Sequence, residues 1–312
     1  MQKLLMPSAD EASRAAVPVE TGSSLVQKSV THSAFTPAFG RPREFLSNRF
    51  VYVVISPRAR GLSIGVNLNP DKHCNFDCGY CEVDRTLPAL ERTLEVDVMA
   101  KELQETLVLA RSGQLRNLPC YRNVPDELLK LRHVTLSGDG EPTLCPNFVD
   151  AVHAVVHVRA LGRFPFFKIV LITNATGLDL PQVQQGLKFF TAHDEVWAKL
   201  DAGTQEYMNR VNRPDCLLEK VLANILFVAR QRPVIIQSLF PLLNGQEPPQ
   251  AEIDQYVARL QELKAAGAKI PLVQIYSATR PSPHSECGHL PLKSLSRIAQ
   301  AVRQVGLNAE VF

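Results

Sequence analysis

Short apolar runs alternate with amphipathic segments from about residue 50 to the end of the chain. Helical patterns lie between or after these runs, at about 95–112, 146–161, 181–191, 217–231, 249–266 and 292–305. Strands separated by helices pair in parallel through right-handed crossovers. The alternation therefore predicts an α/β protein with a mostly parallel sheet. The apolar runs are VYVVIS (51–56), LSIGVNLN (62–69), HVTLSG (133–138), KIVLITN (168–174), EVWAKLD (195–201), VIIQSLF (234–240) and VQIYS (273–277).

Polar residues gather where the predicted strands end. Three cysteines follow the 62–69 run, GDGEPT follows 133–138, NATG follows 168–174, and SATRP ends the last run. Lys199 and Asp201 end the 195–201 run, and Gln237 lies in the next. Ligands of parallel α/β folds bind beyond the carboxyl ends of the strands. We expect the chemistry of this chain at that edge.

Composition narrows the class of protein. The chain has 312 residues, is 45% apolar, and carries a net charge of +3 from 34 basic and 31 acidic residues. This charge neither implies nor excludes nucleic acid. No apolar stretch is long enough to span a bilayer, and the start is too weakly apolar for a secretory signal. We expect a cytoplasmic protein with no membrane partner, whose grouped thiols serve metal or redox chemistry.

Cys74, Cys78 and Cys81 have the spacing C-x-x-x-C-x-x-C. A structural zinc site takes four protein ligands, and no fourth Cys or His stands at a matching spacing downstream, although His73 is adjacent. A ferredoxin cubane takes a fourth thiolate. Three thiolates instead leave one iron of a cubane open to a small molecule.

The residues around these cysteines resemble the signature of the radical S-adenosylmethionine (radical SAM) superfamily. Tyr80 occupies the position of the aromatic residue that precedes the last cysteine, and SGDGEP (137–142) resembles the family's Gly-Gly-Glu-Pro stretch. The resemblance implies one [4Fe-4S] cluster on Cys74, Cys78 and Cys81, with S-adenosyl-L-methionine on the open iron. It further implies that one electron, from a reductant such as flavodoxin or ferredoxin, cleaves S-adenosylmethionine to methionine and a 5′-deoxyadenosyl radical.

The resemblance also assigns contacts with S-adenosylmethionine to positions in this chain. It leaves the catalytic residues toward the substrate unknown, with Arg280 and Cys287 as candidates. The assigned cofactor-binding residues are Tyr80, Gly138, Asp139, Gly140, Glu141, Pro142, Asn174, Lys199, Asp201 and Gln237.

Several long stretches are similar to the iron–sulfur oxidoreductase branch that includes wyosine (tRNA-imidazoguanine) synthetases. They include SPRARGLSIGVNLNPDKHCNFDCGYCEVDR and KLDAGTQEYMNRVNRP, within about 56–281. Wyosine synthetases carry extra N-terminal cysteines for a second cluster, and residues 1–73 contain none. A small-molecule or peptide substrate is therefore favoured over tRNA, with wyosine-type modification as the alternative.

Each candidate residue also has a structural interpretation. Asp139 and Glu141 are residue types found in turns and helix caps, and Asn174 could simply end a strand. Arg280 could form an ordinary salt bridge within its loop. Lys199 and Asp201 share one face of a strand and suit a buried ion pair. Cys120, Cys145 and Cys216 are scattered and predicted to be inert. The loop 278–290, with Cys287, is the predicted cover of the substrate.

Together these features predict a partial (β/α)6 TIM-like barrel of the radical SAM type. A flexible or draped arm occupies residues 1–45, and the radical SAM domain spans 46–312, with its core at about 56–281 and a closing segment at 282–312. The alternative of another class is a non-catalytic iron–sulfur or zinc-binding protein.

Overall fold

The computed structural model describes residues 45–280 and 282–312. The arm predicted for residues 1–45 lies outside the described residues except for Phe45, which is buried, and so does Pro281 of the predicted cover.

An eight-stranded sheet forms the centre of the described chain, in the order β1-β2-β3-β4-β5-β6-β8-β10. Only β1 and β2 pair antiparallel, and every other neighbouring pair is parallel. Strands β7 and β9 form a separate antiparallel pair. The strands are β1 (Val51–Ser56), β2 (Gly61–Asn67), β3 (Leu131–Ser137), β4 (Lys168–Thr173), β5 (Glu195–Lys199), β6 (Val234–Leu239), β7 (Pro241–Leu243), β8 (Val273–Tyr276), β9 (Cys287–His289) and β10 (Ala309–Val311).

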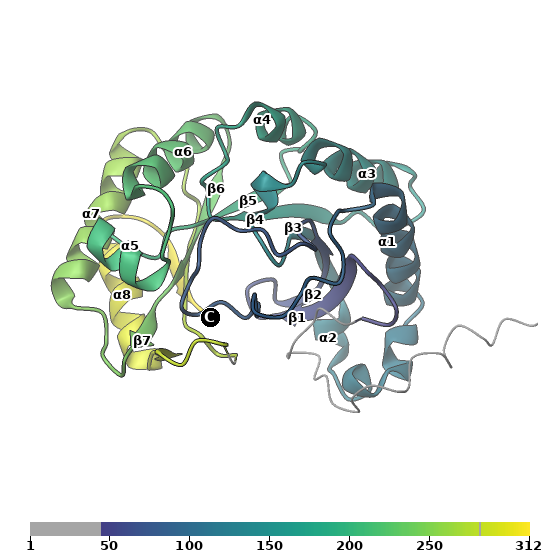
Figure 1. Cartoon of the computed structure of the whole chain (residues 1–312), viewed down its shortest axis with the longest axis horizontal. Coiled ribbons are helices and arrows are strands. Elements are labelled where there is room, and N and C mark those ends of the chain that lie inside the picture. Colours follow the sequence, from purple (N-terminus) through teal and green to yellow (C-terminus); the bar gives the residue numbers. More distant parts are fainter. Residues whose placement is uncertain (1–44, 281) are drawn as a thin grey trace, which may run out of the picture. The chain divides into compact units, whose positions relative to one another are not determined.

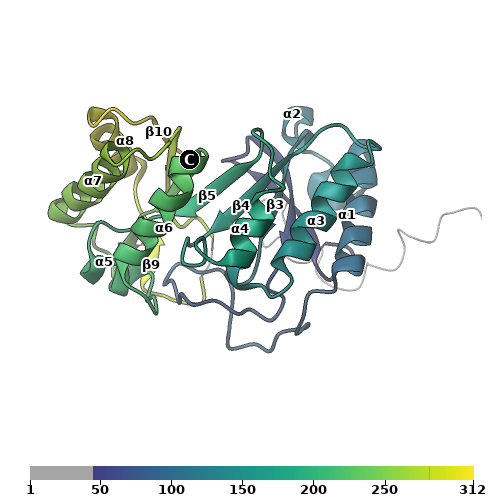
Figure 2. The ribbon, with the colours of Figure 1, turned by 90° about the horizontal axis from the view of Figure 1, so that it is seen from above.

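The large sheet curls into a half-barrel with helices on its outer face (Figures 1 and 2), which confirms the predicted partial TIM-like barrel. Three short 3-10 turns, η1 (Gln114–Asn117), η2 (Pro119–Tyr121) and η3 (Pro142–Leu144), lie in the connections. The helices are α1 (Val96–Arg111), α2 (Asp126–Leu129), α3 (Phe148–Ala160), α4 (Pro181–Leu187), α5 (Gln205–Val211), α6 (Leu218–Gln231), α7 (Gln250–Ala265) and α8 (Leu292–Gln304).

The two faces of the sheet differ in chemistry because successive strand residues point to opposite sides. Ile169 and Leu171 of β4 and Val234 and Ile236 of β6 join the large core beneath the helices. The inner face is more polar, and it carries a small apolar cluster of Val170, Trp197 and Ile235. A polar inner face at the carboxyl ends of parallel strands is where this fold class places its ligands.

The edge strands of the sheet are β1 and β10. An ion pair of 2.6 Å between Arg60, in the turn after β1, and Glu310 of β10 connects these two edges. None of the helices in the described ranges is long and apolar enough to cross a membrane.

All seven predicted strands and six predicted helices are present, with ends displaced by a few residues. The pattern missed α2, α5, β7, β9 and β10, each of seven residues or fewer. The segment 278–290 is not a plain loop as expected, since β9 lies within it and pairs with β7.

Candidate functional site

The three cysteines lie in one loop between β2 and α1, at the carboxyl end of β2. This cysteine loop (residues 68–95) rests on the turn that follows α5. The Gly79 amide donates to the Val211 carbonyl at 2.8 Å, and the Asp77 amide donates to the Asn212 carbonyl at 3.1 Å. The α5 turn therefore fixes the loop from a segment more than a hundred residues away in sequence.

Each thiol sits beside a nitrogen that donates a hydrogen bond to it. Arg85 Nη1 lies 3.2 Å from Cys81 Sγ, Asn212 Nδ2 lies 3.4 Å from Cys78 Sγ, and the Phe76 amide lies 3.4 Å from Cys74 Sγ. Burial raises the pKa of Cys74 to about 11 and that of Cys78 to about 12.

The Arg85 guanidinium contacts the Cys81 sulfur and interacts electrostatically with the other two thiols. Partial burial lowers the pKa of its guanidinium, but Cys81, Cys74 and Cys78 together outweigh that effect and raise it above the ordinary value. The same guanidinium donates to the Asp139 carbonyl at 3.2 Å. The Arg85 side chain thus links Cys81 to the loop after β3.

The loop after β3 (residues 138–141, the GDGE loop) packs directly on the cysteine loop. The Glu141 amide donates to the His73 carbonyl at 3.0 Å. A Cβ built on Gly140 would lie 1.7 Å from that carbonyl oxygen, and one on Gly138 would lie 2.8 Å from Asn69 Oδ1. Both glycines are needed for this close approach.

Asn69 is 2% exposed, and its Oδ1 atom has no hydrogen-bond donor in the described part of the chain. The side chain faces Gly138 and Gly140. A buried acceptor without a donor is rare in folded proteins. It marks a place where a ligand's N–H group would be stabilised.

The Glu141 carboxylate is buried and accepts hydrogen bonds from its neighbours. Thr143, through its amide and hydroxyl, and Thr173, through its hydroxyl, donate to one oxygen, and the Asn174 amide donates to the other at 2.7 Å. Glu141 also caps η3, in which Pro142 is the first residue. The structural interpretation of Glu141 as a cap is thus observed, and its contact with S-adenosylmethionine stays a prediction.

Asn174, at the end of β4, reaches the cysteine loop. Its Nδ2 donates to Asn75 Oδ1 at 2.9 Å, and its Oδ1 accepts from the Thr176 amide at 3.0 Å. Asp139 exchanges two hydrogen bonds with Asn67 at the end of β2, of 2.8 and 2.9 Å. These contacts bring the predicted residues of β2, β3 and β4 to the same edge.

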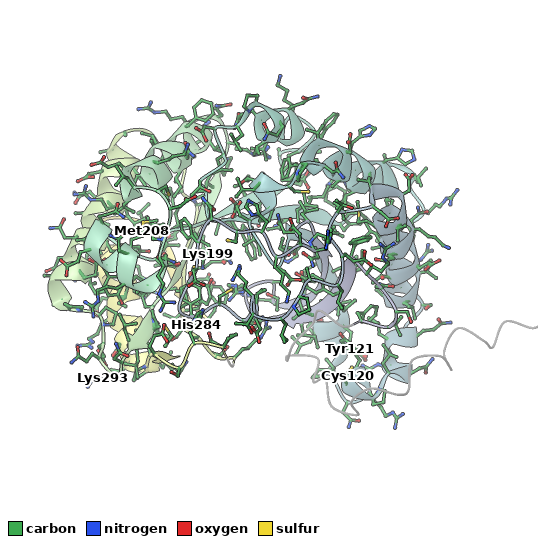
Figure 3. The ribbon with its side chains drawn as sticks, viewed as in Figure 1. Cys120, Tyr121, Lys199, Met208, His284 and Lys293 are labelled. Carbon is green, nitrogen blue, oxygen red and sulfur yellow. The ribbon has the colours of Figure 1, made fainter. Side chains whose placement is uncertain are left out.

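Lys199 and Asp201 form an ion pair of 3.5 Å, as the structural interpretation expects. Asp201 also accepts hydrogen bonds from Tyr80, Asn212 and the Leu239 amide. Lys199 Nζ lies 4.9 Å from the centre of the Tyr80 ring. Figure 3 places Lys199 on the inner side of the curled sheet, away from Cys120. Tyr80 thus connects the cysteine loop to the barrel interior.

Gln237 of β6 pairs with Lys199 of β5 in the sheet register. Its Nε2 donates to Gln274 Oε1 of β8 at 2.8 Å. Both glutamines are buried. The structure gives Gln237 a protein partner, and its predicted contact with S-adenosylmethionine stays a prediction.

The segment 278–290 lies against the cysteine loop. Ser282 Oγ contacts the carbonyl oxygens of Gly79 at 3.1 Å and Cys81 at 2.9 Å. Arg280 forms an ion pair with Glu82 at 3.1 Å, the loop salt bridge named above as its alternative. Cys287 Sγ lies 2.9 Å from a Cβ built on Gly79, and burial raises the pKa of this thiol to about 11.

An open cavity of about 640 Å³ adjoins the cysteine loop. His73, Cys74, Arg85 and Arg213 are among the residues that line it. Across residues 45–280 and 282–312, no group of three or more His, Cys, Asp and Glu side chains is arranged to hold a metal ion. A single zinc ion takes its ligands at about 2.0–2.3 Å, whereas the thiolates of an iron–sulfur cluster bind separate irons.

The pattern of polar strand ends missed Arg85, Asn212, Asn69 and Asn75. Asn69 lies five residues before Cys74, and Asn75 lies inside the cysteine motif, so their nearness to the motif was the available signal. Asn212 lies 134 residues from Cys78, and no local pattern indicates it.

Curated relatives match roughly half of the chain. The UPF0026 protein of Helicobacter pylori is 33% identical over 181 residues, which covers 56% of this chain and 50% of the relative. The UPF0026 protein of Methanocaldococcus jannaschii is 29% identical over 177 residues, which covers 55% of this chain and 47% of the relative. The chain thus spans about half the length of these relatives. No family model matches the chain.

Solved structures are similar over most of the chain. A radical SAM methyltransferase from Sphaerobacter thermophilus superposes with a TM-score of 0.55 at 16% identity, covering 84% of this chain and 68% of that one. The chain has the fold of radical SAM enzymes. TYW1 with a lysine–pyruvate adduct bound superposes with a TM-score of 0.51 at 15% identity, covering 82% of this chain and 84% of that one. Streptococcus suis SuiB bound to S-adenosylmethionine superposes with a TM-score of 0.53 at 15% identity, covering 78% of this chain and 49% of that one.

Proposed function

We propose that this chain is a radical SAM enzyme. Cys74, Cys78 and Cys81 hold one [4Fe-4S] cluster, and S-adenosylmethionine binds beside it and is cleaved to abstract hydrogen from a substrate still to be identified. The observation that carries the proposal is the docking of the cysteine loop on the GDGE loop, through His73 and Glu141. It joins the two motifs of the radical SAM resemblance at the carboxyl edge of the barrel.

The residues present suit the cluster. N–H groups from Arg85, Asn212 and Phe76 donate to the sulfurs of Cys81, Cys78 and Cys74. Donors to thiolate sulfur stabilise the negative charge of an iron–sulfur cluster and raise its reduction potential. When bound, the cluster supplies the electron that cleaves S-adenosylmethionine to methionine and a 5′-deoxyadenosyl radical.

The residues present also suit the methionine end of S-adenosylmethionine. Asn69 Oδ1 offers a buried acceptor for an ammonium group beside Gly138 and Gly140. We assign the ammonium contact chiefly to Asn69 and the GDGE backbone, because the Glu141 carboxylate already accepts hydrogen bonds from Thr143, Thr173 and Asn174. Glu141 then serves to hold the loop in place.

The chain's other residues hold the site in place. Tyr80 and Asn212 fix Asp201, which in turn holds Lys199. The segment 278–290 covers the cysteine loop through Ser282 and Arg280. A reactive radical requires exclusion of water and of stray hydrogen donors, to which this segment would contribute. A flavodoxin or ferredoxin is the proposed reductant.

Spectroscopy of the reduced, cluster-loaded chain tests the proposal. Electron paramagnetic resonance should report a reduced [4Fe-4S] cluster whose spectrum changes when S-adenosylmethionine is added, since the ligand binds iron. A spectrum unaltered by saturating S-adenosylmethionine would favour a non-catalytic iron–sulfur protein. Wyosine-type tRNA modification instead predicts RNA binding that weakens steeply with salt.

A further inference from the structure

Arg58 is an unpaired cation on the inner side of the half-barrel. It lies in the turn between β1 and β2, and its Cζ stands 4.2 Å from the centre of the Tyr276 ring on β8. Its Nε atom is buried without a hydrogen-bond partner. Across residues 45–280 and 282–312, Arg58 has no hydrogen bond and no ion pair.

The neighbouring cations of the inner face are paired. Lys168 forms an ion pair with Glu195, and Lys199 forms one with Asp201. Arg58 alone of these three has no carboxylate partner in the described chain. A partly buried charge without a counter-ion costs free energy, which an anionic ligand would recover.

Tyr276 joins Arg58 to the predicted cofactor site. Its hydroxyl accepts a hydrogen bond from Lys199 Nζ at 3.1 Å, and Lys199 lies 4.9 Å from the Tyr80 ring of the cysteine loop. A line of side chains therefore runs from the cysteine loop through Lys199 and Tyr276 to Arg58. Arg58 starts from the amino end of the parallel strands, and its guanidinium reaches inward to the Tyr276 ring at the carboxyl end of β8. A group held by Arg58 would therefore lie in the barrel interior, beneath the cysteine loop.

We propose that Arg58, with the Tyr276 ring beneath it and Lys199 beyond it, binds an anionic group of the substrate, either a carboxylate or a phosphate. The planar guanidinium donates paired N–H groups that match both anions. The contact with the Tyr276 ring restrains the guanidinium. This inference rests on the proposed function and narrows the substrate to a small anionic molecule.

Trp197 is the chain's single tryptophan and lies on the inner face, two residues before Lys199. Its fluorescence in the cluster-loaded, full-length chain reports binding inside the barrel. Malonate and inorganic phosphate are titrated separately at constant ionic strength, and each titration is repeated by calorimetry. A saturable signal with malonate indicates a carboxylate substrate, and one with phosphate indicates a phosphorylated substrate.

Arg58→Gln should weaken binding of the preferred anion by at least about tenfold. Arg58→Lys keeps the charge without the paired donors and should recover part of the affinity. Arg60→Gln is the matched control, because Arg60 is exposed and already pairs with Glu310. It should bind the anion as the wild type does. Thermal melting of each variant checks that the fold is intact.

Three results would overturn the inference. The first is no saturable binding of either anion to the wild type, and the second is equal anion affinity in Arg58→Gln and the wild type. The third is a loss of S-adenosylmethionine affinity in Arg58→Gln as large as its loss of anion affinity. The last result would assign Arg58 to the cofactor. Cleavage of S-adenosylmethionine without added anion is measured on the same samples. Intact cleavage without anion binding refutes this inference alone, and anion binding without cleavage refutes the proposed function.

Discussion

The His73 carbonyl accepts a hydrogen bond of 3.0 Å from the Glu141 amide, and Gly140 lies directly beneath that carbonyl. The contact joins the loop that carries the cysteines to the loop that follows β3. Neither loop has regular secondary structure of its own at this point. Their mutual packing therefore determines where the cysteines stand relative to the GDGE backbone.

Gly140→Ala should separate the two loops. Its Cβ would lie 1.7 Å from the His73 carbonyl oxygen, so the cysteine loop must move. We expect the iron content after anaerobic reconstitution to fall several-fold. The matched control is Gly288→Ala, whose Cβ would meet Leu242 at an ordinary 3.5 Å. Equal iron loading in both variants would show that loop contact does not position the cysteines.

Cys74, Cys78 and Cys81 should each be indispensable for the cluster. A site with three ligands has no spare thiolate, so replacing any one with alanine should abolish the cluster absorbance or nearly so. Cys120→Ala is the control, because Cys120 lies within the η2 turn, outside the cysteine loop, and Figure 3 shows it well apart from Lys199 of the inner face. Loss of iron from the Cys120 variant would contradict the three-cysteine assignment.

Asn69→Ala should weaken S-adenosylmethionine binding. Its Oδ1 is buried without a donor, and a hydrogen bond to a charged group contributes about 1.5 to 3 kcal/mol. We expect the dissociation constant to rise by about 10- to 100-fold. Asn209→Ala, on the exposed surface of α5, provides the control. Unchanged affinity in the Asn69 variant, measured by calorimetry on cluster-loaded protein, would remove Asn69 from the cofactor site.

The strand and helix positions were predictable because hydrophobic periodicity is local. The mostly parallel pairing followed from the crossover rule, whereas the curl into a partial barrel was implied by the radical SAM resemblance. The surroundings of the thiols were not predictable in the same way. Asn212 reaches Cys78 across 134 residues, from the end of a seven-residue helix with too few turns to give a clear period. Arg58 lies in a turn, and only the three-dimensional fold brings it over Tyr276.

His133 should make the protein less stable at acidic pH. It lies edge-on to Trp197 with ring centres 5.3 Å apart. Burial, helped by the positive charges of Lys168 and Arg58, lowers its pKa from 6.5 to about 3. Below pH 6.5 the unfolded chain binds a proton that the folded chain excludes, so the free energy of unfolding falls as the pH drops toward 3. The slope reaches about 1.4 kcal/mol per pH unit.

Urea unfolding of the wild type and His133→Gln between pH 7.5 and about 4.5 measures this contribution. The free energy of unfolding of the wild type should fall more steeply than that of the variant as the pH drops below 6.5. His289→Gln is the control, because His289 is exposed. Parallel pH profiles for wild type and His133→Gln would show that His133 is not held neutral in the folded chain.

Formation of 5′-deoxyadenosine is the most direct test of the proposed enzyme. The full-length chain is reconstituted anaerobically with iron and sulfide, reduced, and incubated with S-adenosylmethionine alone, and the products are separated by chromatography. We predict that 5′-deoxyadenosine and methionine accumulate with the wild type and not with Cys78→Ala. A wild-type sample that keeps its reduced cluster and binds S-adenosylmethionine, yet yields no 5′-deoxyadenosine, would contradict the assignment of this chain as a radical SAM enzyme.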